Sequence, residues 1–61
     1  MIADKIKQLR TSRDMTQSDL AKKLNITRSS VNAWEMGIAV PSTAILIEIA
    51  QLFHVSTDFL L

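Results

Sequence analysis

The chain has 61 residues, of which 48% are hydrophobic, a net charge of +1 and no cysteine. This length allows one small domain with a single core, residues 1–61, and the lack of cysteine excludes disulfides, thiolate metal sites and a cysteine nucleophile. No apolar run approaches the roughly 18 residues of a membrane span, and the N-terminal MIADKIKQLR lacks the apolar segment of a signal peptide, so we expect a cytoplasmic protein.

The charges are divided unevenly along the chain. All seven Lys and Arg residues fall within residues 1–28, against three acidic ones, whereas residues 29–61 carry three acidic residues and no basic one. A chain that meets a polyanion such as nucleic acid at one end has a split of this kind. A small domain can also divide its charges this way by chance.

Two helices are predicted before residue 25. Apolar residues at i, i+4 and i+7 predict a helix over about residues 2–13: Ile2, Ile6 and Leu9. Thr16 is a good N-cap, and Asp19 three residues later resembles a capping box with Asp in place of Glu. They predict a second helix over about residues 17–24, with one apolar face: Leu20, Ala21 and Leu24.

Three further helices are predicted after Asn25, which tolerates the left-handed conformation of a helix C-terminus. Thr27 caps a third helix over about residues 28–36, which Gly37 ends. A fourth helix follows the loop IAVP and covers about residues 42–53. Its apolar face contains Leu46, Ile49, Ala50 and Phe53.

The last helix is short. Ser56 caps it, and Phe59 and Leu60 are expected to face inward. His54, a lone histidine near a helix end, is interpreted as a capping or surface residue because no second metal ligand accompanies it. β-Hairpin signals such as Asn-Gly are absent. The sequence therefore predicts an all-α domain of five short helices.

The connection between the second and third helices carries the most information. Only Asn25, Ile26 and Thr27 separate them, which suits a helix-turn-helix whose second helix crosses the first steeply. Ala21 supports this reading because a small side chain lets the two helices approach. Apolar residues are available for the contacts between them: Leu20, Leu24, Ile26, Val31 and Trp34.

The segment MTQSDLAKKLNITRSSVNAWEMG resembles the helix-turn-helix of the Cro/cI-type phage-repressor family, also called Xre-type. The segment PSTAILIEIAQLFHVSTDFLL resembles the fourth and fifth helices of the same family. The resemblance covers Ile6 to Leu61 and implies a compact five-helix lambda-repressor-like fold. It also implies a DNA-binding role in which the third helix enters the major groove.

On a helical wheel, the third helix has an apolar side and an opposite polar side. Val31 and Trp34 share the apolar stripe, so Trp34 is predicted to be a core residue rather than a base-stacking one. The polar side can read base edges with donors and acceptors, whereas charges are expected on its flanks, near phosphates. Arg pairs with guanine, Asn with adenine, Ser with either, and an Ala methyl contacts thymine. The expected base contacts are Arg28, Ser29, Asn32 and Ala33, although such a face taken alone is more often simply solvated.

Phosphate contacts are expected beside this helix. In the resembling family a Gln at the start of the second helix contacts a phosphate, which implies that role for Gln17, where the helix N-terminus also attracts anions. We also expect phosphate contacts from Thr27, Ser30 and Arg13. The family often pairs an Arg on the first helix with a Glu at the end of the third, which implies a structural ion pair between Arg10 and Glu35.

The sequence departs from the family in the loop after the third helix. Relatives often carry Lys or Arg there, but IAVP has no base, so we expect few charged phosphate contacts and a shallow salt dependence. Apolar residues of this loop and of the fourth helix suggest an interface. The family forms homodimers near its fourth and fifth helices, which implies a self-contact bordered by Ile45, Thr57, Leu60 and Leu61. Packing within the domain, or against a further C-terminal portion, is the alternative.

Two functions follow. The first is sequence-specific double-stranded DNA binding as a transcriptional regulator, by a homodimer on a palindromic site. We expect this regulator to be a repressor. The alternative is a protein-interaction module on the same fold, of antirepressor or antitoxin type. No catalytic pair or metal-ligand set has recognisable spacing, so no enzyme activity, metal, cofactor, membrane contact or small-molecule site is expected.

Overall fold

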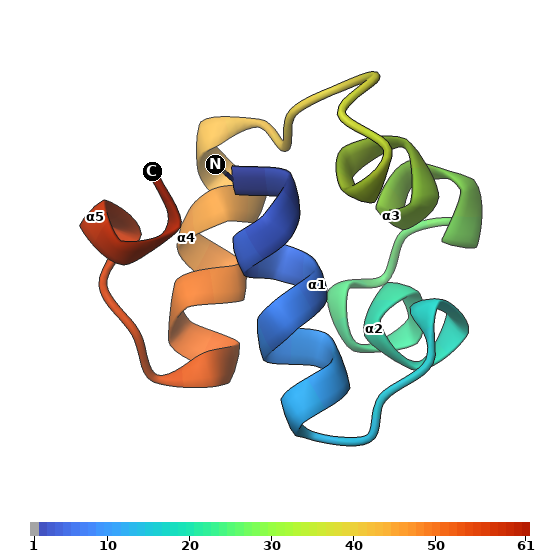
Figure 1. Ribbon diagram of the computed structural model, residues 1–61, viewed down its shortest axis with the longest axis horizontal. Coiled ribbons are helices and arrows are strands. Elements are labelled where there is room, and N and C mark those ends of the chain that lie inside the picture. Colours follow the sequence, from blue (N-terminus) through green and yellow to red (C-terminus); the bar gives the residue numbers. More distant parts are fainter. Residues whose placement is uncertain (1) are drawn as a thin grey trace.

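The computed structural model describes residues 2–61, which form five helices joined by short loops (Figure 1). In chain order they are α1 (Ile2–Ser12), α2 (Gln17–Leu24), α3 (Arg28–Glu35), α4 (Thr43–Phe53) and α5 (Thr57–Leu60). The described residues contain no strand, so the predicted all-α fold is confirmed. No helix among them is long and apolar enough to cross a membrane.

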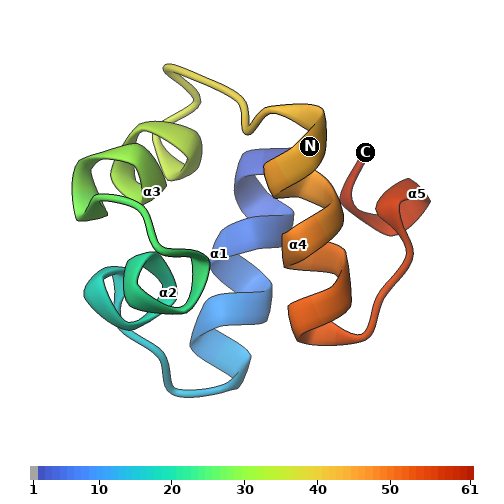
Figure 2. The ribbon, with the colours of Figure 1, turned by 180° about the vertical axis from the view of Figure 1, so that it is seen from behind.

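Helices α1 and α4 occupy the middle of the molecule. Figures 1 and 2 show α2 and α3 on one side of them and α5 on the other. Ile2 and Leu61, at the two ends of the described residues, line the same groove. Helix α1 contacts both α3 and α5, and α2 contacts both α3 and α4. One core therefore joins all five elements, and most of its residues are those on the predicted apolar faces: Ile6, Leu20, Ala21, Leu24, Val31, Trp34, Leu46, Ile49, Ala50, Phe53 and Leu60.

The helix N-termini are capped by the expected hydroxyl side chains. At the start of α2 the capping box is complete, since Thr16 accepts from the backbone N–H of Asp19 and the Asp19 carboxylate accepts from that of Thr16. These hydrogen bonds lower the pKa of Asp19. Thr27, Ser42 and Ser56 cap α3, α4 and α5 with the side-chain half of this arrangement, each accepting from one backbone N–H of the first turn. Each cap satisfies an N–H that the helix itself cannot pair.

Four helix C-termini end with one residue in the left-handed region: Asp14, Asn25, Gly37 and His54, with φ between 55° and 75°. At each, the next residue's N–H donates to a carbonyl five positions earlier, as Met15 does to Arg10 and Val55 does to Ala50. This is the Schellman arrangement, which satisfies carbonyls that the ended helix leaves unpaired. The predicted capping roles of Asn25, Gly37 and His54 are confirmed, whereas Asp14 was not foreseen.

Two expectations for α5 need correction. Leu60 is fully buried, which confirms its expected inward position but means that it cannot border the expected self-contact. Phe59 was expected to face inward, but it is 40% exposed, and its ring lies 4.1 Å from the Lys5 ammonium. Adjacent helical side chains point about 100° apart, and in α5 the side that faces the core carries Leu60, so Phe59 lies at its edge.

Replacing His54 by Gly should raise the free energy of unfolding by about 0.5–1 kcal/mol, because Gly adopts the left-handed conformation without the steric penalty of a Cβ. The matched control Gln51→Gly, three residues earlier inside α4, should lower it by about 1 kcal/mol. Urea denaturation measures both values. Equal destabilisation by the two substitutions would contradict strain at His54.

Candidate nucleic-acid interface

The turn between α2 and α3 is built by two backbone conformations. Asn25 has φ 58° and ψ 46°, and its N–H donates to the carbonyls of Ala21 and Lys22. Thr27 is extended, with φ −85° and ψ 152°, and opens α3. One left-handed residue followed by an extended one redirects the chain within three residues. Ala21 is 3% exposed, so its small side chain lies where the two helices pack.

Helix α3 is anchored through its apolar stripe and free on its other side. Val31 and Trp34 are buried in the core, which confirms the predicted place of Trp34. Arg28, Ser29 and Asn32 are exposed, and the two predicted residues nearer the core, Ser30 and Ala33, are half-buried. The exposed residues fall at i, i+1 and i+4 of one helix and therefore share a side.

An ion pair fixes α3 against α1. Arg10 Nε donates to Glu35 Oε2 at 2.7 Å, and Arg10 Nη2 donates to Glu35 Oε1 at 3.0 Å. Arg10 Nη1 also donates to the Met15 carbonyl at 2.7 Å. The side chains are 11% and 5% exposed. The predicted pair is confirmed, and its two parallel hydrogen bonds define both distance and orientation.

The charges of this pair stabilise each other. Burial raises the pKa of Glu35, but hydrogen bonds from Arg10 and Gln17, together with the charge of Arg10, outweigh burial and hold that pKa below its usual value. The hydrogen bond to Glu35 raises the pKa of Arg10. Both side chains are therefore ionised at neutral pH.

Gln17, the first residue of α2, bridges to α3. Its Nε2 donates to Glu35 Oε1 at 3.1 Å and to Asn32 Oδ1 at 3.3 Å. An amide nitrogen has two protons, so both are used inside the protein and neither remains for a phosphate. The expected phosphate contact of the Gln17 side chain stays a prediction, and it requires one of these two hydrogen bonds to be exchanged for the phosphate. The backbone N–H groups of Gln17 and Ser18 have no partner within α2, because they lie in its first turn.

The other expected phosphate-contacting residues differ in their surroundings. The hydroxyls of Thr27 and Ser30 are 3.1 Å apart and share one hydrogen bond, which leaves one hydroxyl proton for an outside acceptor. Arg13 Nη2 instead donates to the Phe53 carbonyl at 3.2 Å, and its guanidinium lies 5.4 Å from the Phe53 ring. Arg13 thus lies at the C-terminal end of α4, where helix carbonyls favour a cation, and its expected phosphate contact stays a prediction.

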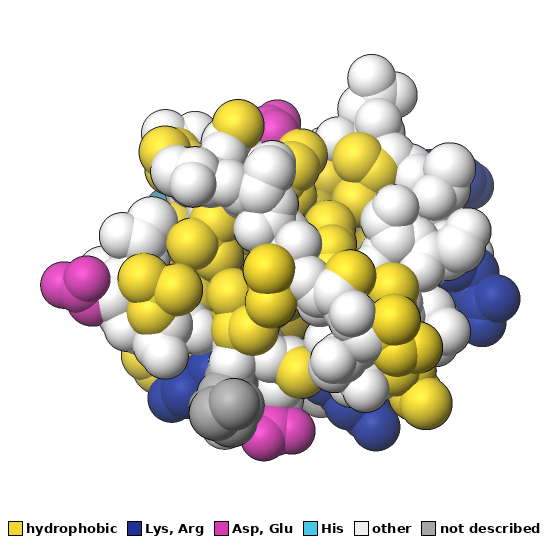
Figure 3. Space-filling model, turned by 90° about the horizontal axis from the view of Figure 1, so that it is seen from above, with side chains coloured by type: hydrophobic (Ala, Val, Ile, Leu, Met, Phe, Trp, Pro, Cys, Tyr) yellow, Lys and Arg dark blue, Asp and Glu magenta, His cyan; other side chains and the backbone are white. Residues whose placement is uncertain are grey.

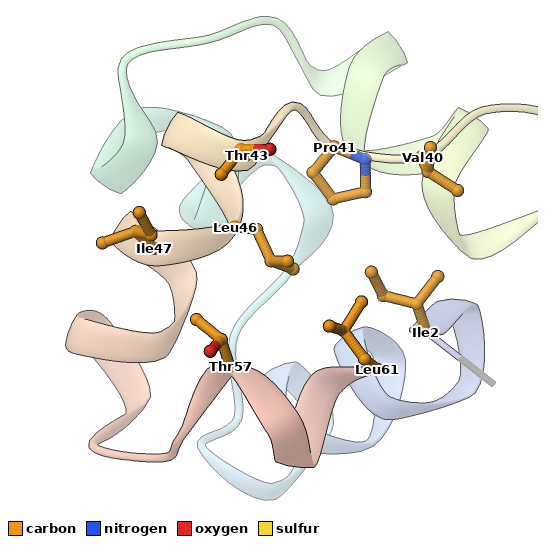
Figure 4. Close-up of a pocket in the computed structure, with 8 residues that line it drawn as sticks. All are labelled: Ile2, Val40, Pro41, Thr43, Leu46, Ile47, Thr57 and Leu61. Carbon is orange, nitrogen blue, oxygen red and sulfur yellow. The ribbon is translucent and has the colours of Figure 1, made fainter.

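A separate apolar groove of about 570 Å³ lies where the N-terminus, the loop before α4, α4 and α5 converge. Figure 4 shows its lining: Ile2, Val40, Pro41, Thr43, Leu46, Ile47, Thr57 and Leu61. Figure 3 shows hydrophobic side chains gathered on this face, with charged ones mostly at its edges. Of the four residues expected at a self-contact, Thr57 and Leu61 line the groove, Ile45 is half-buried against the core, and Leu60 is excluded.

The comparisons with known proteins agree with this geometry. A family model described as "Helix-turn-helix" matches residues 6–60. The chain is 38% identical over 61 residues to the HTH-type transcriptional regulator YqaE of Bacillus subtilis (strain 168), covering all of this chain and 53% of YqaE. It is 39% identical over 56 residues to the antitoxin PezA of Streptococcus pneumoniae serotype 4, covering 92% of this chain and 35% of PezA.

A solved structure is similar over the whole domain. The master regulator for biofilm formation SinR, described in complex with DNA, has a TM-score of 0.87 and 30% identity, over 98% of this chain and 97% of that one. The chain belongs to the Cro/cI-type helix-turn-helix family. It spans about half the length of YqaE and about a third of PezA.

Within this family frame, sequence reasoning missed the link from Gln17 to Asn32 and Glu35. Gln17 and Asn32 are 15 positions apart, and no sequence spacing reports a contact that depends on how α2 crosses α3. The one available signal is an amide side chain at the first position of α2, because this position lies where α2 crosses α3 and lets the amide bridge the two helices.

Removing one partner of the ion pair should be costly. Arg10→Ala should lower the free energy of unfolding by about 3 kcal/mol, because it leaves the nearly buried Glu35 carboxylate without its cation. The double variant Arg10→Met/Glu35→Leu should recover most of this loss, since it removes both charges and keeps apolar volume. Urea denaturation at neutral pH measures both.

The control is the dependence of the free energy of unfolding on pH in the acid range. The pKa of Glu35 is lower in the folded chain than in the unfolded chain, so its stabilisation is complete above the ordinary carboxyl pKa of about 4.3 and is lost as the pH falls through the folded-state value. The double variant should lack this component of the pH profile. A double variant as unstable as Arg10→Ala, or an unchanged acid profile, would contradict this account of the pair.

Proposed function

We propose that the chain is a sequence-specific double-stranded DNA-binding domain of a transcriptional regulator that acts in the cytoplasm. Of the two kinds of regulator, we propose a repressor rather than an activator. The observation that carries this proposal is the geometry of α3. Val31 and Trp34 hold one side of the helix in the core, while its exposed side presents hydrogen-bonding groups and one cation. An α-helix of this kind fits the major groove. The likeness to SinR, described in complex with DNA, supports the same conclusion.

The base contacts are assigned by exposure and chemistry. Arg28, at the first position of α3, suits the two acceptors of guanine. Ser29 and Asn32 share its side and offer smaller donors and acceptors. Ala33 is half-buried, so its methyl group reaches a thymine only if the helix sits deep in the groove. Arg28 is therefore the main expected source of specificity.

Phosphate contacts in this proposal come mostly from neutral donors. The backbone N–H groups that open α2 and the hydroxyl pair of Thr27 and Ser30 flank α3. Helix N-termini bind phosphate through such N–H groups and the helix dipole. Few cations then neutralise phosphates, because the loop IAVP is uncharged and Arg13 is engaged with Phe53. Weak binding by a monomer and a shallow salt dependence follow.

Arg28→Ala should weaken binding to the preferred DNA site by about 5- to 150-fold, corresponding to about 1–3 kcal/mol for one bidentate base contact. The preferred site comes from selection in a randomised duplex pool, and fluorescence anisotropy at several salt concentrations measures affinity. The wild-type slope of log K against log salt should be no steeper than about −3 per half-site.

The matched control is Lys23→Ala, which removes the same charge from the last turn of α2. It should leave the preferred sequence unchanged. Equal losses in the two variants would mean that Arg28 acts as a general cation, and a wild-type chain that enriches no sequence would reject the proposed function.

The proposed regulator acts as a homodimer on a palindromic site, with the apolar groove as the self-contact. Val40 and Leu61 border the groove with 71% and 76% of their surfaces exposed. Residues 36–47 contain no charged side chain, so this part of the contact would bring no like charges together. Two copies of α3 would then read half-sites about 34 Å apart, one turn of DNA.

Val40→Asp should leave the fold intact, because the side chain is exposed, but should abolish self-association by placing a charge in the apolar contact. Sedimentation over a concentration series, with and without palindromic DNA, measures it. Gln51→Asp adds the same charge at the far end of α4 and should associate as the wild type does. A wild-type chain that stays monomeric even on DNA would reject the homodimer.

An alternative function is a protein-interaction module of antitoxin type. The likeness to the antitoxin PezA and the apolar groove favour it. The two functions use different surfaces, so Arg28→Ala separates them. It should weaken site-specific DNA binding by the same about 5- to 150-fold if α3 reads bases, and should leave partner binding intact if the groove holds a protein.

A further inference from the structure

A chain of polar contacts runs from the interior to the proposed base-reading face. Arg10 holds Glu35, Glu35 Oε1 accepts from Gln17 Nε2 at 3.1 Å, and the same nitrogen donates to Asn32 Oδ1 at 3.3 Å. Glu35 is nearly buried, Gln17 is half-buried and Asn32 is exposed. The contacts therefore connect a fixed ion pair to a side chain at the surface.

The donor and the acceptor of each hydrogen bond in this series follow from the ion pair between Arg10 and Glu35. Arg10 keeps Glu35 ionised, and an ionised carboxylate only accepts hydrogen bonds. The amide atom of Gln17 that faces it must therefore be the nitrogen. That nitrogen only donates, so the atom of Asn32 that faces it must be the oxygen. If the Gln17 amide alone were turned over, its oxygen would face both the Glu35 carboxylate and Asn32 Oδ1, two acceptors at each contact; if both amides were turned over, the contact with Glu35 would still join two acceptors.

We infer that Gln17 is a positioning residue that sets which side of the Asn32 amide meets a base. This inference rests on the proposed function, because it concerns how α3 reads DNA. With Oδ1 turned toward Gln17, Asn32 presents the N–H groups of Nδ2 on its other side. The second lone pair of Oδ1 can still accept a hydrogen bond, but the N–H groups of Nδ2 are the ones that point away from Gln17, toward a base.

The consequence is a preference for a base that offers an acceptor in the major groove. Purine N7, guanine O6 and thymine O4 are such acceptors, whereas cytosine offers only the N4 amino donor there. Asn32 should therefore reject cytosine at the position it faces. Without Gln17, the amide can rotate to present either its oxygen or its nitrogen, and that rejection weakens.

The test compares Gln17→Leu, Asn32→Ala and the double variant by selection from a randomised duplex pool. The position whose preference changes in Asn32→Ala is the base that Asn32 faces. At that position, discrimination against cytosine by the wild type should be about tenfold and should fall to about twofold or less in Gln17→Leu. Preferences elsewhere, including the one lost in Arg28→Ala, should stay the same.

The double variant separates positioning from other roles. If Gln17 acts through Asn32, then Gln17→Leu has no further effect on base preference in the Asn32→Ala background. A Gln17→Leu variant that binds every sequence more weakly but keeps the wild-type preference would overturn the inference and indicate a backbone or stability role. The inference is also overturned if Asn32→Ala changes no base preference.

Two controls keep these outcomes distinct. Gln51→Leu makes the same replacement on the exposed surface of α4 and should leave the preference unchanged. Gln17→Met repeats the test with an unbranched apolar side chain of similar length, and thermal unfolding confirms that each variant is folded. Loss of the proposed function would appear as a wild-type chain that selects no sequence, whereas failure of this inference alone leaves the wild-type and Arg28 results intact.

Discussion

The contact between Arg10 and Glu35 fixes the position of the helix that the proposed function depends on. From α1, the guanidinium holds the carboxylate at the end of α3 through two hydrogen bonds and holds the Met15 carbonyl, just before α2, through a third. Apolar packing alone specifies that Val31 and Trp34 face inward, but it tolerates small rotations of α3. A planar, bidentate ion pair does not, because both of its hydrogen bonds weaken when the helices turn.

Short, well-defined helix ends allow so small a chain to form a core at all. Four helices end in the same left-handed arrangement, and four begin with a hydroxyl cap. The loops are therefore short, and most of the described residues lie in helices that contribute side chains to the core. At Asn25 the same left-handed helix end also sets the angle at which α3 leaves α2. The arrangement that ends four of the helices therefore also positions α3 in the candidate nucleic-acid interface.

The two surfaces of the domain have opposite chemistry. The exposed side of α3 offers hydrogen-bonding groups and Arg28, whereas the groove between the N-terminus, α4 and α5 is apolar and its surroundings carry little charge. A domain with few cations near its reading helix binds DNA weakly as a single copy. In the proposed homodimer, contact through the groove joins two reading helices and so compensates for the weak DNA binding of each copy. The apolar face and the weak phosphate binding are therefore explained together.

The sequence by itself determined the helices, their caps, the helix-turn-helix and the inward position of Trp34, because periodicity and capping act within a few residues of the chain. The resemblance added the pairing of Arg10 with Glu35. Only the tertiary structure decided that Phe59 is exposed beside the buried Leu60, that Arg13 packs on Phe53, and that Gln17 reaches Asn32. These contacts join residues up to 40 positions apart, and they depend on how the helices cross, which no local pattern specifies.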